Sequence, residues 1–270
     1  MITFIPTPIG NPQDITLRAM KTFEKATLFL CEDTRLTKRL LRLLEERFDM
    51  QYPEAVFYSF NEHNGEERLV QLASEFSSHE VVYVSDAGMP VISDPGQLLV
   101  AHCQDHAIAY DVLPGASAVT TAYAASGLEA GKFIFYAFLP HKGKERITAL
   151  SEVMNHRYHT VLYESPHRLE KLLDEIEAID ESRELFLAKE ISKRYQNYYR
   201  GSAKVLNKTL KSLTIRGEWV VIISAKDVKE KSLSFNEILH LDLPPKPKAK
   251  LLAQLSDKSV KEWYDVLIQK

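Results

Sequence analysis

Residues 81–90, VVYVSDAGMP, join a short run of β-branched and aromatic residues directly to a loop of small residues. Such a run, apolar almost throughout, is typical of a strand buried on both faces of a parallel sheet. The loop combines Gly88 with Asp86, so a ligand can approach the backbone closely while the carboxylate accepts a hydrogen bond. A buried strand that ends in an unusual loop is a pattern that recurs through the first half of the chain.

Four more segments of the first half have the same character, namely ITFIPTPI (2–9), ATLFLC (26–31), AVFYSF (55–60) and AIAYDVL (107–113). Patterns with helical periodicity lie between the strands, at 17–26, 36–48, 66–76 and 96–106. Apolar strands that alternate with helices predict an α/β domain with a parallel sheet covered on both faces. We assign this domain to residues 1–118.

A second α/β domain is predicted for residues 119–225. Its expected strands are FIFYAFL (133–139), TVLYE (160–164), ELFLAKE (184–190) and EWVVIIS (218–224), with helices at 146–155 and 168–179. The composition then changes, and Pro244, Pro245 and Pro247 indicate a semi-rigid linker. Two short helices, 249–255 and 260–270, are expected after it, so residues 226–270 are predicted to form a linker and a small helical appendage.

The composition excludes several classes of protein. No apolar run approaches the roughly 20 residues that cross a bilayer, and the N-terminus lacks the basic start of a secretory signal. Cys31 and Cys103 are the only cysteines, which favours a reducing compartment and therefore a cytoplasmic protein. The net charge of −3 is uneven, because residues 1–118 hold 9 Lys+Arg against 17 Asp+Glu, whereas residues 119–225 hold 16 against 13. An anionic partner is therefore permitted on one side of the molecule.

Several familiar motifs are absent or incomplete. The segment Gly127–Lys132 has too few residues between its glycines for a phosphate-binding P-loop, and no G-x-G-x-x-G is present. His102 and His106 are one helical turn apart but lack the glutamate of a zinc protease motif, so a solvated helix face is the better interpretation and no metal site is expected. Ser117 has no nearby base in the sequence.

The loops after the predicted strands share one chemical theme. They are rich in Gly, Pro, Ala and Ser, they contain no lysine, and in an open α/β sheet they gather at the edge where ligands bind. The segment that begins at Ser117 and Ala118 opens a helix whose free N–H groups suit a polar ligand end. The absence of lysine disfavours a triphosphate, so a zwitterionic or nucleoside-like ligand is predicted.

These loops resemble those of the tetrapyrrole-methylase superfamily, the class III S-adenosylmethionine-dependent methyltransferases. The segments that carry the resemblance are TPIGNPQDITLRA, CEDTRLTKRLL, SFNEHN, SDAGMPVISDPG, PGASAVTTAYAASGL, FYAFLP, YESPHR and GEWVVII, together with the tail KAKLLAQLSDKSVKEWYDVL. Within the superfamily, YESPHR and CEDTR resemble the ribosomal RNA small-subunit methyltransferase I branch. One departure is Met89, where most relatives are expected to have threonine.

The resemblance implies two α/β domains with the cofactor, S-adenosylmethionine, in the cleft between them, and a homodimer. The cofactor-binding residues that it implies are Pro8, Gly10, Asp86, Gly88, Met89, Val91, Ser117, Ala118, Leu139 and Glu218. Methyl transfer to a hydroxyl also needs a base, or a cation that stabilises the alkoxide. The candidates for these catalytic roles are Glu32, Arg35, Glu164, Arg168 and Lys189, with Glu32 or Glu164 as the base. A structural ion-pair network is the alternative for each of them.

RNA contacts are expected from a basic turn and from the YESPHR segment. The candidates are Lys142, Lys144, Arg146 and His167, and a solvated basic turn is the alternative for the first three. The activity implied by the resemblance is 2′-O-methylation of a cytidine ribose in the decoding region of 16S ribosomal RNA, with the RNA or the 30S particle as partner. A corrinoid or tetrapyrrole precursor C-methyltransferase and a non-catalytic S-adenosylmethionine sensor are the alternatives.

Overall fold

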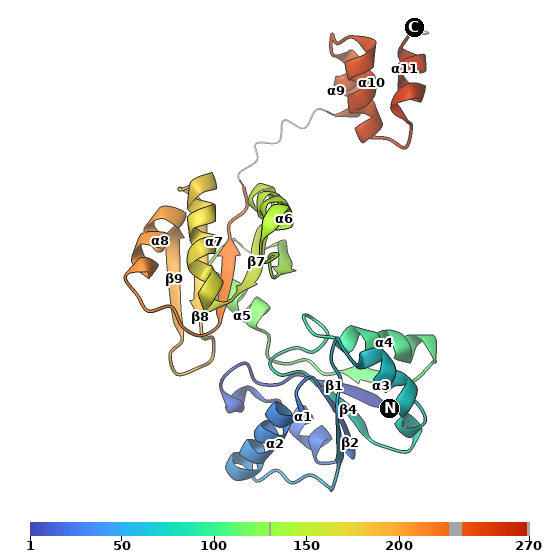
Figure 1. Cartoon of the computed structure of the whole chain (residues 1–270), viewed down its shortest axis with the longest axis vertical. Coiled ribbons are helices and arrows are strands. Elements are labelled where there is room, and N and C mark those ends of the chain that lie inside the picture. Colours follow the sequence, from blue (N-terminus) through green and yellow to red (C-terminus); the bar gives the residue numbers. More distant parts are fainter. Residues whose placement is uncertain (130, 227–233, 269–270) are drawn as a thin grey trace. The chain divides into compact units, whose positions relative to one another are not determined.

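The computed structural model describes residues 1–129, 131–226 and 234–268, and it divides into two compact units, Met1–Lys226 and Asp227–Lys270 (Figure 1). The first unit contains two five-stranded sheets, and the described residues of the second form helices and no strand. Within the described residues, no helix is both long enough and apolar enough to cross a membrane.

The first sheet is entirely parallel, as predicted. Its strands are β1 (Ile2–Ile5), β2 (Leu28–Cys31), β3 (Val56–Ser59), β4 (Val81–Val84) and β5 (Tyr110–Val112), in the order β3-β2-β4-β1-β5. Successive side chains of a strand point to opposite faces, and in β4 Val82 and Val84 join one buried cluster while Val81 and Tyr83 join another. The sheet therefore has a hydrophobic core on each face.

Helices cover both faces of this sheet. Phe23 of α1 (Leu17–Phe23) and Leu41 of α2 (Thr34–Phe48) pack on one face, after a short 3₁₀ turn η1 (Pro12–Asp14). Leu72 of α3 (Gly65–Leu72) and Leu99 of α4 (Gly96–Asp105) pack on the other, with a second 3₁₀ turn η2 (Glu75–Ser77) between them. The N-terminus of α2 is capped by Asp33, whose carboxylate accepts the backbone N–H of Arg35 at 2.8 Å.

The second sheet is mixed. Its strands are β6 (Phe133–Ala137), β7 (His159–Glu164), β8 (Glu184–Lys189), β9 (Asn197–Ser202) and β10 (Trp219–Ile223), in the order β6-β7-β10-β8-β9. Only β6 and β7 pair in parallel, and the other three pairings are antiparallel. The edge strand β9 and the helix after it, α8 (Ala203–Lys211), are absent from the sequence prediction. No residue of β9 is buried and the strand lacks a clear apolar alternation, whereas α8 has a buried stripe that includes Leu206 and Leu210 and could have been found.

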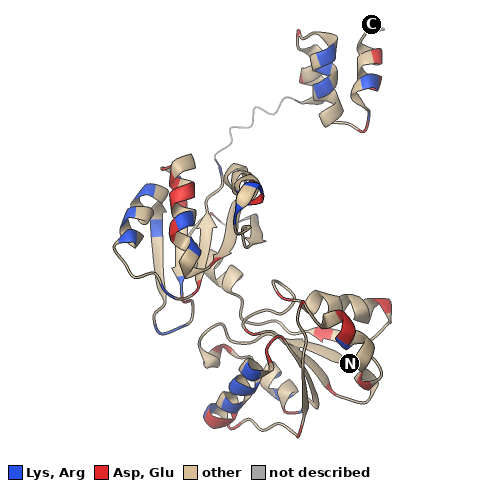
Figure 2. Ribbon diagram, in the orientation of Figure 1, with Lys and Arg blue, Asp and Glu red and all other residues tan. Residues whose placement is uncertain are grey.

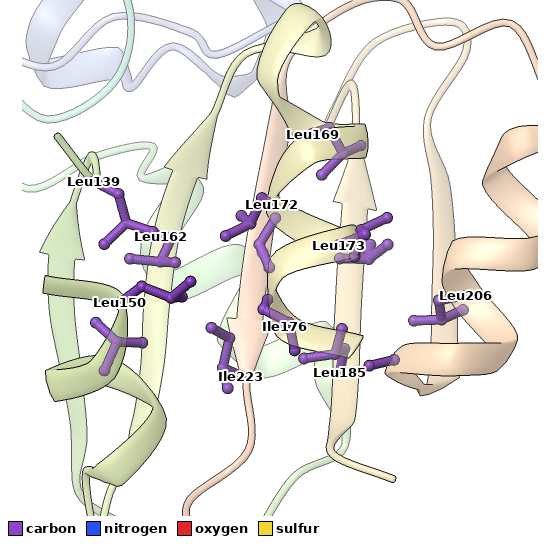
Figure 3. Packing of buried hydrophobic residues seen from close by; sticks show 14 of the residues in the cluster. Leu139, Leu150, Leu162, Leu169, Leu172, Leu173, Ile176, Leu185, Leu206 and Ile223 are labelled. Carbon is purple, nitrogen blue, oxygen red and sulfur yellow. The ribbon is translucent and has the colours of Figure 1, made fainter. Parts of the chain in front are cut away.

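Helices also cover both faces of the second sheet. Val119 and Ala122 of α5 (Ala118–Ser126) pack on one face. The other face holds α6 (Gly143–Asn155), α7 (Pro166–Ile179) and α8 (Figure 3). Figure 3 shows the α7 side chains Leu169, Leu172, Leu173 and Ile176 directed at the sheet, which is the stripe expected of an amphipathic helix.

The second unit is a small helical bundle, as expected, although its details differ from the prediction. It comprises α9 (Phe235–His240), α10 (Pro245–Gln254) and α11 (Val260–Ile268), and Phe235 packs on Trp263 with ring centroids 5.3 Å apart. Pro245 and Pro247 lie in the first turn of α10, where proline is tolerated, so they begin a helix and do not form a linker. Part of the predicted linker is helix α9, and residues 227–233 lie outside the described residues. The boundary at 118/119 remains a proposal.

Candidate active site

A cavity of about 480 Å³ lies in the first unit, and both sheets contribute to its walls. The first sheet supplies the loops after β1, β2 and β4 and the start of α5, at the carboxyl ends of its parallel strands. The second sheet supplies the ends of β6, β7 and β8 and the start of β10. The lining residues are Ile9, Glu32, Ser85, Asp86, Ala87, Gly88, Met89, Ile92, Ser93, Asp94, Ser117, Ala118, Phe138, Tyr163, Glu164, Ser165, Pro166, Ala188, Ile191, Glu218, Trp219 and Val220.

A backbone bridge joins the loop after β1 to the loop after β4. The N–H of Thr7 donates to the carbonyl of Gly88 and the N–H of Gly88 donates to the carbonyl of Thr7, both at 3.1 Å. The Ser85 hydroxyl also donates to the Gly88 carbonyl at 3.1 Å. Gly88 has φ +82°, and a Cβ there would lie 3.1 Å from Ile9 Cγ2, so this position requires glycine. The bridge holds this wall of the cavity in place.

Carboxylates concentrate on the cavity wall. The Asp86 side chain accepts the backbone N–H of Asp33 at 3.0 Å, and the Asp86 N–H donates to the Glu32 side chain at 3.1 Å. Burial raises the pKa of both Glu32 and Asp86, and neighbouring carboxylates add to the effect. Asp94 and Glu218 also line the cavity, and although Glu218 pairs with Lys193 at 2.8 Å, the carboxylates together favour a cationic ligand.

Asp94 holds the turn that leads into α4. Its two carboxylate oxygens accept the hydroxyl of Tyr83 and the backbone N–H groups of Val91 and Gly96, all at 2.8 Å. A Cβ on Gly96 would lie 2.7 Å from the Tyr83 ring. Val91 adopts φ +73°, and its N–H bond to Asp94 supports this strained conformation.

Glu164 is a buried carboxylate at the end of β7. One oxygen accepts the backbone N–H of Ser165 at 2.8 Å and lies 3.2 Å from Arg168 Nε. Arg168 in turn donates to the carbonyl of Leu139 at 2.6 Å, which ties the start of α7 to the loop after β6. Burial raises the pKa of Glu164, although the Ser165 amide and the Arg168 guanidinium oppose the shift. The second oxygen, Oε2, is buried without a hydrogen-bond partner among the described residues.

A smaller, open cavity of about 200 Å³ adjoins the large one. Glu32, Ser93 and Asp94 line both cavities, and the smaller cavity adds Asn61, Glu62, His63 and Pro95. Asn61 and His63 belong to the turn after β3, which the Asn64 side chain stabilises by accepting the Asn61 N–H at 2.8 Å. Glu32 therefore lines both cavities and has a raised pKa.

The structure places eight of the predicted cofactor and catalytic residues on the large cavity and the others away from its lining. Those on the lining are Glu32, Asp86, Gly88, Met89, Ser117, Ala118, Glu164 and Glu218. Those away from it are Pro8, Gly10, Arg35, Val91, Leu139, Arg168 and Lys189. Several residues of the second group lie next to a lining residue in the sequence or contact one.

Three of the supporting residues have clear packing roles. Gly10 packs against the turn after β8, and a Cβ there would lie 2.8 Å from the backbone carbon of Ser192. Leu139 is buried in the core of the second sheet. Lys189 pairs with Trp219 across the sheet and places its ammonium 5.6 Å from the indole ring. These contacts give each of the three positions a packing role, and their predicted roles in cofactor binding and catalysis stay predictions.

The two predicted arginines also have protein partners. Arg35 is exposed and forms a bidentate contact with Asp33, the closest approach being 2.6 Å, which lowers the pKa of Asp33 to about 2. Arg168 is committed to Glu164 and Leu139, as described above. Neither guanidinium lines the large cavity.

One predicted RNA contact is wrong. Arg146 is only 2% exposed, pairs with Glu175 of α7 at 2.7 Å and donates to the Pro140 carbonyl at 3.0 Å. Its guanidinium is buried against these partners and is therefore not accessible to a phosphate of RNA. Lys142, Lys144 and His167 are exposed, so their proposed role stays open to test.

Several lining residues were missed by the sequence analysis. Phe138 and Tyr163 are in ring contact with centroids 5.6 Å apart, and Trp219 follows the predicted Glu218. Asp94 precedes Pro95 and Gly96 in a turn that opens a helix, and this local signal was available in the sequence. The described residues contain no group of three or more His, Cys, Asp or Glu side chains that could hold a metal ion.

Comparison with known proteins relates this site to a family. Residues 1–207 match the model of the Tetrapyrrole (Corrin/Porphyrin) Methylases. A Helicobacter pylori protein named ribosomal RNA small subunit methyltransferase I is 43% identical over 98% of this chain and 96% of its own length. A protein of the same name from Campylobacter fetus is 40% identical over 99% of this chain and 100% of its own length.

Solved structures share the fold at low sequence identity. A cobalt precorrin-4 methyltransferase of cobalamin biosynthesis has a TM-score of 0.61 and 17% identity, covering 83% of this chain and 94% of its own. A uroporphyrin-III C-methyltransferase from Thermus thermophilus, complexed with S-adenosylhomocysteine, has a TM-score of 0.57 and 16% identity, covering 83% and 96%. These similarities concern the fold.

Proposed function

The chain belongs to the tetrapyrrole methylase family, and from this premise we propose that it 2′-O-methylates a cytidine ribose in the decoding region of 16S ribosomal RNA. S-adenosylmethionine is the cofactor, and the resemblance inferred from the loop motifs is confirmed. The observation that carries the choice of RNA is the extent of similarity. The relatives named for ribosomal RNA are 40–43% identical to this chain over 98–99% of its length, whereas the two solved tetrapyrrole enzymes are only 16–17% identical to it.

The large cavity fits S-adenosylmethionine. Its volume of about 480 Å³ lies in the usual range for small-molecule sites, and Asp86 and Glu218 provide negative charge for a ligand with a sulfonium and an ammonium group. The Ser117 side chain makes no capping hydrogen bond with α5, so it leaves the first turn of this nine-residue helix open to a ligand carboxylate, although the Val119 N–H already interacts with the Tyr163 hydroxyl. When bound, S-adenosylmethionine supplies an electrophilic methyl group.

We assign the general base to Glu32. A ribose hydroxyl is a poor nucleophile until it loses its proton, and a carboxylate with a raised pKa is a stronger base than an ordinary one. Glu32 faces both cavities, so a nucleotide in the smaller cavity would present its hydroxyl to Glu32 beside the cofactor. The Asp86 N–H holds one carboxylate oxygen of Glu32 and thereby orients the group.

Glu164 and Arg168 act in this proposal as positioning residues. Arg168 anchors the carbonyl of Leu139, directly after Phe138, which is 51% exposed at the cavity wall. Lys142 ends the same loop and Lys144 lies in the first turn of α6, where both would reach the phosphates of the RNA. The resemblance to the family also supports a homodimer that acts in the cytoplasm, and sedimentation of the full chain tests the dimer.

Radiolabelled methyl transfer tests the proposal. The full chain is offered 30S particles, free 16S RNA and a corrinoid precursor, and labelled RNA is then digested to locate the methylated nucleotide. We expect label on a cytidine ribose. Label on the corrinoid carbon would favour the tetrapyrrole alternative, and label in none of the substrates would favour a sensor.

The Glu32→Gln variant tests the assignment of the base. General-base catalysis contributes roughly a hundredfold or more, so we expect kcat to fall by about that factor while cofactor affinity changes little. The wild-type rate should rise with pH as Glu32 ionises, and the variant should lack this limb of the profile. A variant with full kcat would exclude Glu32 as the base.

A further inference from the structure

Helix α2 carries a row of cations on its exposed face. Arg35, Lys38, Arg39 and Arg42 have the spacing i, i+3, i+4 and i+7, which places them on one side of a helix. All four are exposed, while the opposite side buries Thr37, Leu41 and Leu44. Figure 2 shows the blue segments that follow one another along α2. We call these four residues the α2 ridge.

The ridge stands out against an acidic background. Residues 1–118 contain 9 Lys+Arg and 17 Asp+Glu, and four of the nine cations belong to the ridge. The first turn of α2 contains Arg35 and no acidic residue, although the helix dipole favours negative charge there. The helix dipole therefore gives no reason for cations at this end of α2.

Two ridge cations are also free of ion pairs. Arg35 contacts Asp33, and the Lys38 ammonium lies 4.7 Å from the Phe57 ring centroid. Within the described part of the chain, Arg39 and Arg42 form no salt bridge. Their charges are therefore available to a partner.

The ridge begins beside the proposed active site. Glu32 lines both cavities, Asp33 caps the helix, and the Asp33 N–H binds the side chain of Asp86 on the cavity wall. From Arg35 to Arg42 the ridge extends about 10 Å along the helix. The cavities themselves are lined by carboxylates, which repel phosphate groups. A polyanionic substrate therefore needs cations outside the cavities but close to them.

We propose that the α2 ridge binds the phosphate backbone of the RNA substrate and guides the target nucleotide to the cavity. The inference rests on the proposed function and adds a second contact surface to the β6–α6 loop. Contacts of this kind fix the position of the RNA without reading its sequence. They act on RNA affinity and leave cofactor binding unchanged.

The test uses Arg39→Gln/Arg42→Gln in the full chain, with Lys21→Gln/Lys25→Gln on and just after α1 as a control with the same change in net charge. Both control lysines are exposed. Binding of a 16S RNA fragment is measured by fluorescence anisotropy at several salt concentrations, together with KM and kcat for 30S particles. We expect the ridge variant to bind RNA about tenfold more weakly, at roughly fivefold or less per exposed contact. Its salt slope should decrease by about 1.4 if both contacts are to single-stranded RNA.

The outcomes distinguish a failure of the ridge proposal from a failure of the proposed function. If the wild type methylates RNA and the ridge variant matches the control in affinity, salt slope and KM, the ridge proposal is wrong and the function stands. If the wild type binds RNA without methylating it and the ridge variant loses binding, the ridge stands and the function fails. A wild type that neither binds nor methylates RNA overturns both. A changed sedimentation coefficient of the ridge variant would assign the ridge to a contact between copies of the chain and overturn its role in RNA binding.

Discussion

Replacing Arg168 by alanine removes one half of a nearly buried ion pair. The Glu164 side chain is 1% exposed and that of Arg168 is 21% exposed, so the substitution leaves a carboxylate without its cation in a site that water hardly reaches. Breaking such a pair from one side typically destabilises a protein by about 3–5 kcal/mol. The partial exposure of Arg168 favours the lower end, about 3 kcal/mol. In a unit of this size each kcal/mol lowers Tm by about 2–4 °C, so we expect a decrease of about 6–12 °C.

The loss should depend on pH in a defined direction. Burial already raises the pKa of Glu164 and the Arg168 charge opposes that shift, so the pKa rises further in the variant. A carboxyl group whose folded pKa exceeds its unfolded pKa binds protons more readily in the folded state. Stability therefore falls as pH rises from the unfolded pKa to the folded pKa, and it is recovered below that window. Arg168→Ala should consequently be closer to the wild type at pH 5 than at pH 8.

Calorimetric unfolding at pH 5 and pH 8 measures this difference. The double variant Glu164→Gln/Arg168→Ala is the matched control, because it removes both charges and should be more stable at pH 8 than Arg168→Ala. Cofactor affinity, measured by titration calorimetry, should change little, while methyl transfer should decrease because the loop after β6 loses its anchor at Leu139. The reasoning is refuted if Arg168→Ala unfolds at the wild-type Tm at pH 8, or if the double variant is the less stable of the two.

Three further changes probe other parts of the site. Asp86→Ala removes a charge from the cavity wall and should weaken S-adenosylmethionine binding by roughly ten- to a hundredfold in titration calorimetry; unchanged affinity would exclude Asp86 as a ligand. Gly10→Ala places a Cβ 2.8 Å from the backbone of Ser192 and should lower stability by about 1–3 kcal/mol, whereas Gly201→Ala, with neighbours no closer than 3.7 Å, should change thermal unfolding less. Ending the chain at Lys226 removes the helical unit and should leave cofactor affinity intact while raising KM for 30S particles; an unchanged KM would give that unit another purpose.

The parallel sheet could be predicted because each of its strands carries its own signal. In β4 every residue is buried and the neighbouring segments are helical, so local pattern and tertiary environment agree. The edge strand β9 has no such agreement, because none of its residues is buried and its pairing with β8 is visible only in three dimensions. The same applies to Pro245, whose place in a first helical turn depends on the helix that follows.

The residues of the site likewise differ in whether local sequence or tertiary contacts decide their place. Asp86 and Ser117 follow strands that end at one edge of the first sheet, and topology alone brings their loops to one cavity. The partner of Arg146 is Glu175, 29 residues away on another helix, and no spacing in the sequence predicts this ion pair. Arg35 and Arg168 could be assigned to a charged site but not to their protein partners, since ion pairing depends on side-chain direction as well as on position.

The two-way backbone bridge between Thr7 and Gly88 has a thermodynamic consequence for binding. Two loops that would otherwise fluctuate independently share a pair of hydrogen bonds before any ligand arrives. A ligand that settles against them does not have to order either loop, so the loss of conformational entropy that accompanies many binding events is small at this wall. Any conformational freedom that is lost on binding is then lost by other parts of the site, because this wall already has its final shape in the folded protein.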